Sequence, residues 1–218
     1  AVDAEQLLAD RVGGRVVERG RVARQAGDDR QPIRPLELVE VIDNGSDAPG
    51  TILDDYSRYI VAWKLCTTMK AVDVTDTLDL ALEASGCAHA TVVHKPRLLS
   101  DNGSSYIASD LADYLEDKGM DHVRGAPYHP QTQGKIERWH QTLKNRILLE
   151  NYYLPGDLRQ QINAFVDHYN HRRYHESLQN LTPADVYFGR GETILKQRER
   201  IKRKTIETRR LLHRKSAA

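Results

Sequence analysis

The chain has few of the features that mark disulfide-rich or membrane proteins. It contains two cysteines, Cys66 and Cys87, and neither belongs to a Cys-x-x-Cys pair, so no disulfide framework is predicted. No apolar run is long enough to cross a bilayer, and the N-terminal segment has no hydrophobic signal-peptide core. These absences favour an intracellular protein that does not act in a membrane.

Aromatic residues are missing from the first part of the chain. Residues 1–50 contain no Phe, Trp, Tyr, His, Lys, Cys or Met, and therefore have few groups with which to build a core. Only the apolar stretch at 36–42 predicts a strand, with Asn44-Gly45 as a turn after it. We interpret 1–50 as an atypical segment, either disordered or translated from a shifted reading frame, with one strand at 36–42.

The net charge of +1 conceals a strong asymmetry, because the C-terminal end of the chain is basic. Residues 192–218 contain ten Lys and Arg residues against three acids, a formal charge of +7. Such a segment suits a polyanion, and phosphates are the obvious partner. We therefore predict that 191–218 form a basic helical tail that contacts nucleic acid. The alternative is a solvated, charge-laced helix.

The middle of the chain, 51–190, alternates strand and helix patterns and predicts an α/β fold with a mixed sheet. The expected strands are a hairpin at 51–53 and 59–65 and short strands at 92–93, 98–100 and 122–124. The expected helices cover 71–85, 104–118, 132–151 and 157–173, with Asp157 as an N-cap, and a further helix starts at Thr182.

Two carboxylates stand in settings that suit a shared metal site. Asp101 follows the predicted strand at 98–100, and Glu137 lies early in the predicted helix at 132–151, with 35 residues between them. Mg²⁺ prefers hard oxygen ligands, and a pair of ions about 3.5–4 Å apart can promote phosphoryl transfer. Taken singly, Asp101 suits a turn cap and Glu137 a solvated helix position. Together they indicate phosphoryl transfer on nucleic acid.

The flanking residues carry a specific resemblance. The stretch 128–138 (YHPQTQGKIER) resembles the motif around the catalytic glutamate of insertion-sequence transposases and retroviral-type integrases, and 99–103 (LSDNG) resembles the motif around their second aspartate. The segments 53–58 and 169–178 are similar to further parts of this DDE class. The resemblance covers about 51–190, which we identify as an integrase catalytic core. It implies a ribonuclease-H-like mixed sheet flanked by helices.

The resemblance also implies a function. The expected chemistry is DNA strand transfer with Mg²⁺ or Mn²⁺, with Asp101 and Glu137 as metal ligands. The expected partners are DNA, both element ends and target, and further copies of the chain when it is active. The expected location is the bacterial cytoplasm at the nucleoid. Residues in the matching motifs, and Lys144 further along the same predicted helix, are predicted to contact DNA: Gln133, Lys135, Arg138, Lys144, Arg172 and Arg173.

One element of the family pattern is missing. The family's first strand carries a metal-bridging aspartate, which the spacing to Asp54 places near position 36, where this chain has Leu36. Asp43 is kept as a candidate replacement, and Glu40 is the other carboxylate weighed for that role. We therefore predict a chain that is inactive or nearly so. The alternatives are a non-catalytic DNA-binding remnant or regulator, and a nuclease of the same fold that acts on another nucleic acid.

Overall fold

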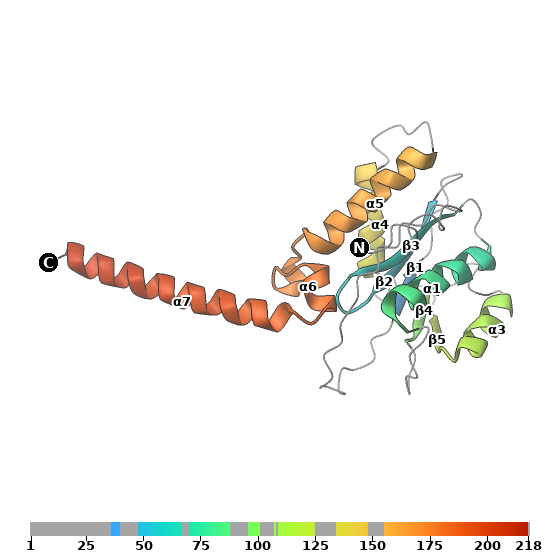
Figure 1. The fold of residues 1–218 in the computed structure, drawn as a ribbon, viewed down its shortest axis with the longest axis horizontal. Helices are drawn as coiled ribbons and strands as arrows, with labels where there is room; N and C mark the ends of the chain where they lie inside the picture. Colours follow the sequence, from blue (N-terminus) through green and yellow to red (C-terminus); the bar gives the residue numbers. More distant parts are fainter. Residues whose placement is uncertain are drawn as a thin grey trace, which may run out of the picture. The chain divides into compact units, whose positions relative to one another are not determined.

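A five-stranded mixed sheet forms the centre of the computed structural model, which describes residues 36–39, 48–66, 70–87, 96–100, 107, 109–124, 134–147 and 155–217. The strands are β1 (Leu36–Val39), β2 (Ala48–Asp54), β3 (Ile60–Cys66), β4 (Leu98–Ser100) and β5 (His122–Arg124). Their order across the sheet is β3-β2-β1-β4-β5 (Figure 1). The β1–β2 and β2–β3 pairs are antiparallel, and the β1–β4 and β4–β5 pairs are parallel. The predicted α/β fold with a mixed sheet is confirmed.

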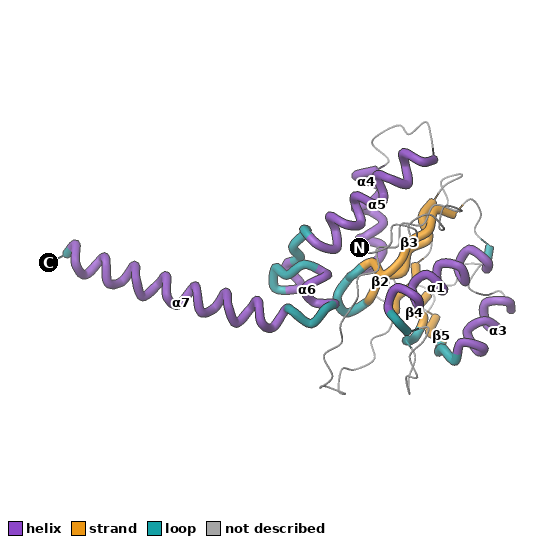
Figure 2. The backbone as a smooth tube through the Cα atoms, in the orientation of Figure 1, coloured by secondary structure: helices purple, strands orange, loops and turns teal. Residues whose placement is uncertain are grey.

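Helices cover both faces of this sheet (Figure 2). One face packs against α1 (Ala71–Ser85) and α3 (Ser109–Lys118), in a cluster that includes Ile52 and Leu78. The other face packs against α4 (Gly134–Ile147) and α5 (Pro155–His171), in a cluster that includes Leu53, Ile136 and Trp139. Because successive strand residues point to opposite faces, Ile52 and Leu53 of β2 supply one side chain to each cluster.

The helix boundaries agree with the sequence patterns in most places. Helix α1 covers the predicted range and ends at Gly86, whose φ of 73° lies in the left-handed region that glycine adopts without strain. Helix α5 begins at Pro155, so Asp157 lies in its first turn and is not its N-cap, which corrects the prediction. Proline is favourable in the first turn, where its missing N–H costs no hydrogen bond. The predicted strand at 92–93 lies outside the described residues.

One side chain hydrogen-bonds helix α5 to the outer strand β3. The buried amide of Asn170 accepts a hydrogen bond from the Ile60 N–H at 2.9 Å and donates one to the Ile60 carbonyl at 3.0 Å. Asn170 thus takes the place of a neighbouring strand at this point and satisfies both backbone groups. The β2–β3 turn, which ends next to Ile60, is thereby held against the C-terminal half of α5.

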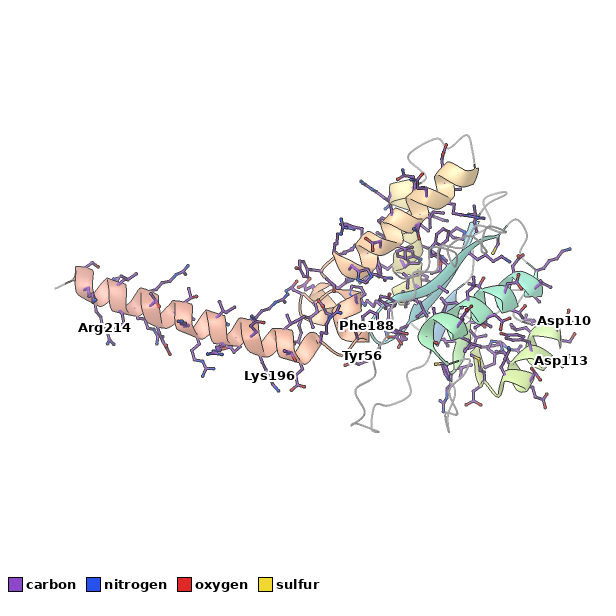
Figure 3. All side chains as sticks on the ribbon, in the orientation of Figure 1. Tyr56, Asp110, Asp113, Phe188, Lys196 and Arg214 are labelled. Atoms are coloured by element: carbon purple, nitrogen blue, oxygen red, sulfur yellow. The ribbon has the colours of Figure 1, made fainter. Side chains whose placement is uncertain are left out.

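The last two helices differ in how much of their surface is exposed to solvent. Helix α6 (Pro183–Tyr187) starts with a capping box between Thr182 and Asp185, as the sequence predicts, and Pro183 and Ala184 are buried. Helix α7 (Gly191–Ser216) exposes nearly all its side chains, including those of Lys196 and Arg214 (Figure 3). The predicted helical tail is present. Among the described residues no helix has the length and apolar character needed to span a membrane.

Candidate functional site

The parallel strands β1 and β4 end at the same edge of the sheet. Leu36 pairs with Leu98 and Glu37 with Leu99, after which β1 continues to Val39 and β4 to Ser100. The predicted ligand Asp101 is the residue that follows β4 in the sequence. Asp101 itself lies outside the described residues, as do the candidates Glu40 and Asp43. The carboxyl edge of β1 and β4 is therefore the part of the sheet from which a site with Asp101 would be built.

Glu137 lies in the first turn of α4, and its side chain is exposed. Its neighbours anchor the helix, because Ile136 is fully buried and Trp139 is 1% exposed in the cluster beneath the sheet. An acidic residue in the first turn also interacts favourably with the helix dipole. The sequence prediction that Glu137 lies early in a helix is confirmed, and the helix is held firmly at this end.

Lys135 is engaged within the protein. Its ammonium group donates a hydrogen bond to the backbone carbonyl of Asp55 at 2.9 Å and forms an ion pair with the Asp55 carboxylate. The contact joins the first turn of α4 to the β2–β3 turn, two residues from Glu137. Because Asp55 compensates the charge of Lys135, this lysine is better placed to position α4 than to bind a phosphate, a role that the sequence did not predict.

The other predicted DNA contacts fall into separate environments. Arg138 is exposed and Lys144 half-buried on α4, whereas Arg172 lies 3.6 Å from the Asp167 carboxylate. The guanidinium of Arg173 lies over the Tyr169 ring, 5.6 Å from its centroid. Gln133 lies outside the described residues. The predicted DNA contacts therefore do not share one environment: two lie on α4, and two lie at the end of α5 with different partners.

The β2–β3 turn places an arginine that sequence reasoning missed. Asp54 is buried and its carboxylate accepts hydrogen bonds from the Ser57 N–H at 2.9 Å and the Ser57 hydroxyl at 2.5 Å. Arg58 follows with a φ of 63°, an unusual conformation for a residue with a side chain. Such backbone is held by the surrounding structure and often marks functional sites. The available signal was the similarity of 53–58 to the family, which by itself indicates only the fold.

The described residues do not complete a two-metal site. Within them, no group of three or more His, Cys, Asp or Glu side chains is placed to hold a metal ion. Strand β1 runs Leu-Glu-Leu-Val and contains no aspartate. Glu137 is one carboxylate of the donor set that the family resemblance implies, and Asp101 would be a second. Among the described residues, no third carboxylate is placed with Glu137 to complete a site for a pair of Mg²⁺ ions.

The pairing of β1 also moves the expected position of the missing aspartate. Counting back from Asp54 placed it at Leu36, but Leu36 is the first residue of β1 and pairs with Asp54 itself. The last residue of β1 is Val39, at the strand end nearest to Asp101 in the parallel pair. The chain between the end of β1 and Asp54 is thus shorter than the family spacing implies. Val39 is therefore a better counterpart of the missing aspartate than Leu36.

Two buried histidines make the stability of the fold pH-dependent. Burial lowers the pKa of His140 to about 4, with a smaller effect from Lys144. Burial, followed by the charges of Arg173 and Arg58, lowers the pKa of His175 to about 4. The Nε2 atoms of both rings are buried without a hydrogen-bond partner among the described residues. Both imidazoles are therefore neutral in the folded protein near pH 7.

We expect the free energy of unfolding to fall as the pH is lowered from about 6.5 towards 4, because the unfolded histidines bind protons that the folded ones resist. The loss is at most about 1.4 kcal/mol per pH unit for each histidine. Urea denaturation at about pH 7.5 and about pH 5.5 measures it. His140→Leu should flatten the dependence and the exposed-site variant His213→Gln should not. Equal stability at both pH values would contradict the prediction.

Comparison with known families gives a consistent assignment. Residues 40–130 and 118–183 each match a family described as "Integrase core domain". An uncharacterized protein of Caenorhabditis elegans is 29% identical over 140 residues, which are 64% of this chain and 10% of that protein. The Gag-Pro-Pol polyprotein of squirrel monkey retrovirus is 41% identical over 58 residues, 27% of this chain and 3% of the polyprotein. The chain thus matches a tenth or less of the length of these relatives.

Solved structures agree on the fold. The catalytic core domain of HTLV-2 integrase, in complex with magnesium, superposes with a TM-score of 0.53 at 16% identity, over 71% of this chain and 95% of that one. The catalytic core domain of BIV integrase superposes with a TM-score of 0.51 at 21% identity, over 75% of this chain and 99% of that one. These similarities confirm the predicted fold class.

Proposed function

Because this chain carries an integrase core domain of the DDE integrase and transposase type, we propose that it is a DNA-binding protein of the strand-transfer class whose catalytic site is incomplete. Asp101 and Glu137 are the two carboxylates that we assign to the site. In this proposal the third carboxylate is absent, so the chain binds DNA but does not cleave or join it efficiently. It acts at the bacterial nucleoid.

The observation that carries this proposal is the composition of the central strand. β1 occupies the middle of the sheet between β2 and β4, and its four residues include no aspartate. The proposal retains Asp101 and Glu137 as ligands, because β4 ends one residue before Asp101 and α4 is anchored beside Glu137. Loss of one bridging carboxylate should abolish binding of the metal pair, because each ion depends on shared ligands.

Relaxation of supercoiled plasmid DNA tests the proposal without knowledge of an element end sequence. We expect no nicking in Mg²⁺ or Mn²⁺ above the level of Glu137→Gln. Binding of a fluorescent duplex should persist in the presence of a metal chelator. Robust nicking that disappears in Glu137→Gln would contradict the proposed inactivity, and would indicate that a residue in 1–50 supplies the missing ligand.

The second candidate is a non-catalytic regulator derived from a transposase, and α7 favours it. Its basic residues include a stripe along one side of the helix (Lys196, Arg200, Arg203, Arg210 and Arg214). Their spacing places them opposite Ile194, Ile201 and Leu212. All five basic side chains are exposed, and among the described residues only Lys196 has an acidic partner, Glu192. A solvated basic stripe of this kind suits the phosphate backbone of duplex DNA.

Removing charge from this stripe should weaken DNA binding independently of sequence. We expect the variant with Arg203→Gln, Arg210→Gln and Arg214→Gln to lower the slope of log K against log salt by about 0.9 for each phosphate that the helix no longer neutralises. Fluorescence anisotropy over a series of salt concentrations measures it on two unrelated duplexes. Lys64→Gln is the control, because Lys64 is paired with Asp73 and Asp76. An unchanged slope would show that α7 does not contact DNA.

An active form of this core would also need several copies. A chain from a structure of the simian T-cell lymphotropic virus intasome superposes with a TM-score of 0.52 at 18% identity, over 68% of this chain and 53% of that one. By analogy we propose that the chain associates with itself on DNA. Sedimentation of the protein with and without duplex DNA tests this, and a monomer under both conditions would contradict it.

A further inference from the structure

Tyr169 of α5 is a buried meeting point of several elements. Its side chain is 4% exposed, and its ring makes edge contacts with Trp139 of α4, at 4.6 Å between centroids, and with His175, at 5.0 Å. The neighbouring residue Asn170 holds the backbone of Ile60 at the start of β3. Helix α4, the end of α5 and the β2–β3 turn therefore converge around residues 169 and 170.

Each of these three elements carries an arginine close in sequence to a residue of the convergence. Arg173 follows α5 and places its guanidinium over the Tyr169 ring, at 5.6 Å. Arg138 immediately precedes Trp139, which contacts the same ring, and immediately follows Glu137. Arg58 lies two residues before Ile60 in the turn that Asn170 fixes. We call Arg58, Arg138 and Arg173 the arginine cluster.

The positive charge of the arginine cluster is not compensated within the described part of the chain. None of the three forms an ion pair with a carboxylate there, whereas the adjacent Arg172 contacts Asp167. Arg58, Arg173 and Arg138 all act electrostatically on the Tyr169 phenol, where they oppose the burial that raises its pKa to about 12. Guanidinium groups that act on one buried phenol repel each other, and an anion bound among them would lower that repulsion.

A buried polar group close to the cluster also lacks a partner. His175 is 9% exposed, packs against Tyr169, and its Nε2 atom has no hydrogen-bond partner among the described residues. A buried polar atom without a hydrogen-bond partner is unfavourable. An anion with several acceptor oxygens would satisfy the guanidinium donors, and the neutral imidazole can donate as well.

We propose that Arg58, Arg138 and Arg173 together bind one backbone phosphate of a DNA strand next to Glu137. This inference rests on the proposed DNA-binding function and adds a defined phosphate site to it. A planar guanidinium presents paired donors that match phosphate oxygens, and each arginine comes from a different element. The site forms only when the β2–β3 turn, α4 and α5 are packed together. Its position beside Glu137 would fix the register of the strand on the core.

The test is DNA binding by single and double variants of the arginine cluster. We expect Arg138→Gln, Arg173→Gln and Arg58→Asn each to weaken binding of a fluorescent duplex roughly tenfold. Asparagine is chosen at position 58 because it tolerates the left-handed backbone of Arg58. Because the three share one phosphate, a double variant should lose at most about twofold more than a single variant. The salt slope should fall by the same amount, about 0.9, in all of them.

Matched variants separate this proposal from simple loss of charge or of fold. Arg172→Gln removes a charge next to Arg173 that is already paired with Asp167, and should change affinity less than about twofold. Arg138→Lys should recover part of the affinity, and thermal denaturation confirms folding. Additive losses with a salt slope that falls again at each substitution would show three separate contacts and overturn the proposal. Wild-type affinity in all three single variants would also overturn it.

Inorganic phosphate distinguishes the source of the anion. We expect millimolar phosphate to compete with duplex DNA in the wild type and not in Arg58→Asn. If phosphate raises the melting temperature of the wild type alone but the variants bind DNA normally, the site takes a free anion and the proposal is wrong. If the wild type does not bind DNA under any salt condition, the proposed function fails first, an outcome distinct from failure of the cluster.

Discussion

Val39→Asp is expected to give the chain a metal-dependent DNA-nicking activity roughly 100-fold above its own background. The substitution places a carboxylate at the end of β1, at the edge of the sheet where β4 leads into Asp101. Position 39 pairs with Thr51 of β2. Thr51 alternates with Ile52, which packs against α1, so position 39 belongs to the face of the sheet that α4 covers. Plasmid relaxation in Mg²⁺ measures the gain.

Three controls make this result specific. Val39→Asn has nearly the same shape without the charge and should stay at background. Leu38→Asp adds the same carboxylate one residue earlier, at a position that pairs with Ile52 on the opposite face, and should also stay at background. Adding Glu137→Gln to Val39→Asp should abolish the gain. Activity in Leu38→Asp but not in Val39→Asp would show that the register argument is wrong.

Trp139→Ala is expected to lower the free energy of unfolding by about 3–5 kcal/mol, close to the whole stability of a marginal domain. The indole is 1% exposed. It stacks on Phe165 at 5.5 Å and meets Tyr169 edge-on at 4.6 Å, so its loss leaves a cavity between α4 and α5. Urea denaturation followed by circular dichroism measures the loss.

The control for this prediction is an exposed apolar residue of the same fold. Val72 on α1 is 61% exposed, and Val72→Ala should change stability by less than about 0.5 kcal/mol. Trp139→Phe should lower the free energy of unfolding by an intermediate amount, because phenylalanine retains much of the apolar volume of the indole. A loss below about 1 kcal/mol in Trp139→Ala would mean that α4 is not anchored through this residue, and that Glu137 is held by other contacts.

The sequence was sufficient for features that depend on local pattern. Apolar spacing predicted α1 and its end at Gly86, and the Thr182–Asp185 capping box predicted the start of α6. The charge of the tail and the helical setting of Glu137 were equally visible. These features could be predicted because they are set by residues within one or two helical turns of each other.

The sequence could not give relations between distant segments. Spacing placed the missing aspartate at Leu36, because it assumed a standard connection between the first two strands. The pairing of β1 with β2 and β4 moved it to Val39. The ion pair between Lys135 and Asp55, 80 residues earlier, was likewise not visible in the sequence, and DNA contact by Lys135 stays a prediction. Connections vary in length at little cost in free energy, so counting along the chain does not fix the strand register.

For this protein, the sequence by itself predicted the class: an integrase-like core with Asp101 and Glu137 as candidate ligands, and no aspartate at the position where the family pattern expects the third. The tertiary structure decided which groups act together. It packed α4, the end of α5 and the β2–β3 turn around Tyr169 and Asn170, and it paired Lys135 with Asp55 and Arg172 with Asp167. The physical reason is that a motif consists of residues close together in the sequence. Charge compensation depends instead on which distant side chains come into contact when the chain packs.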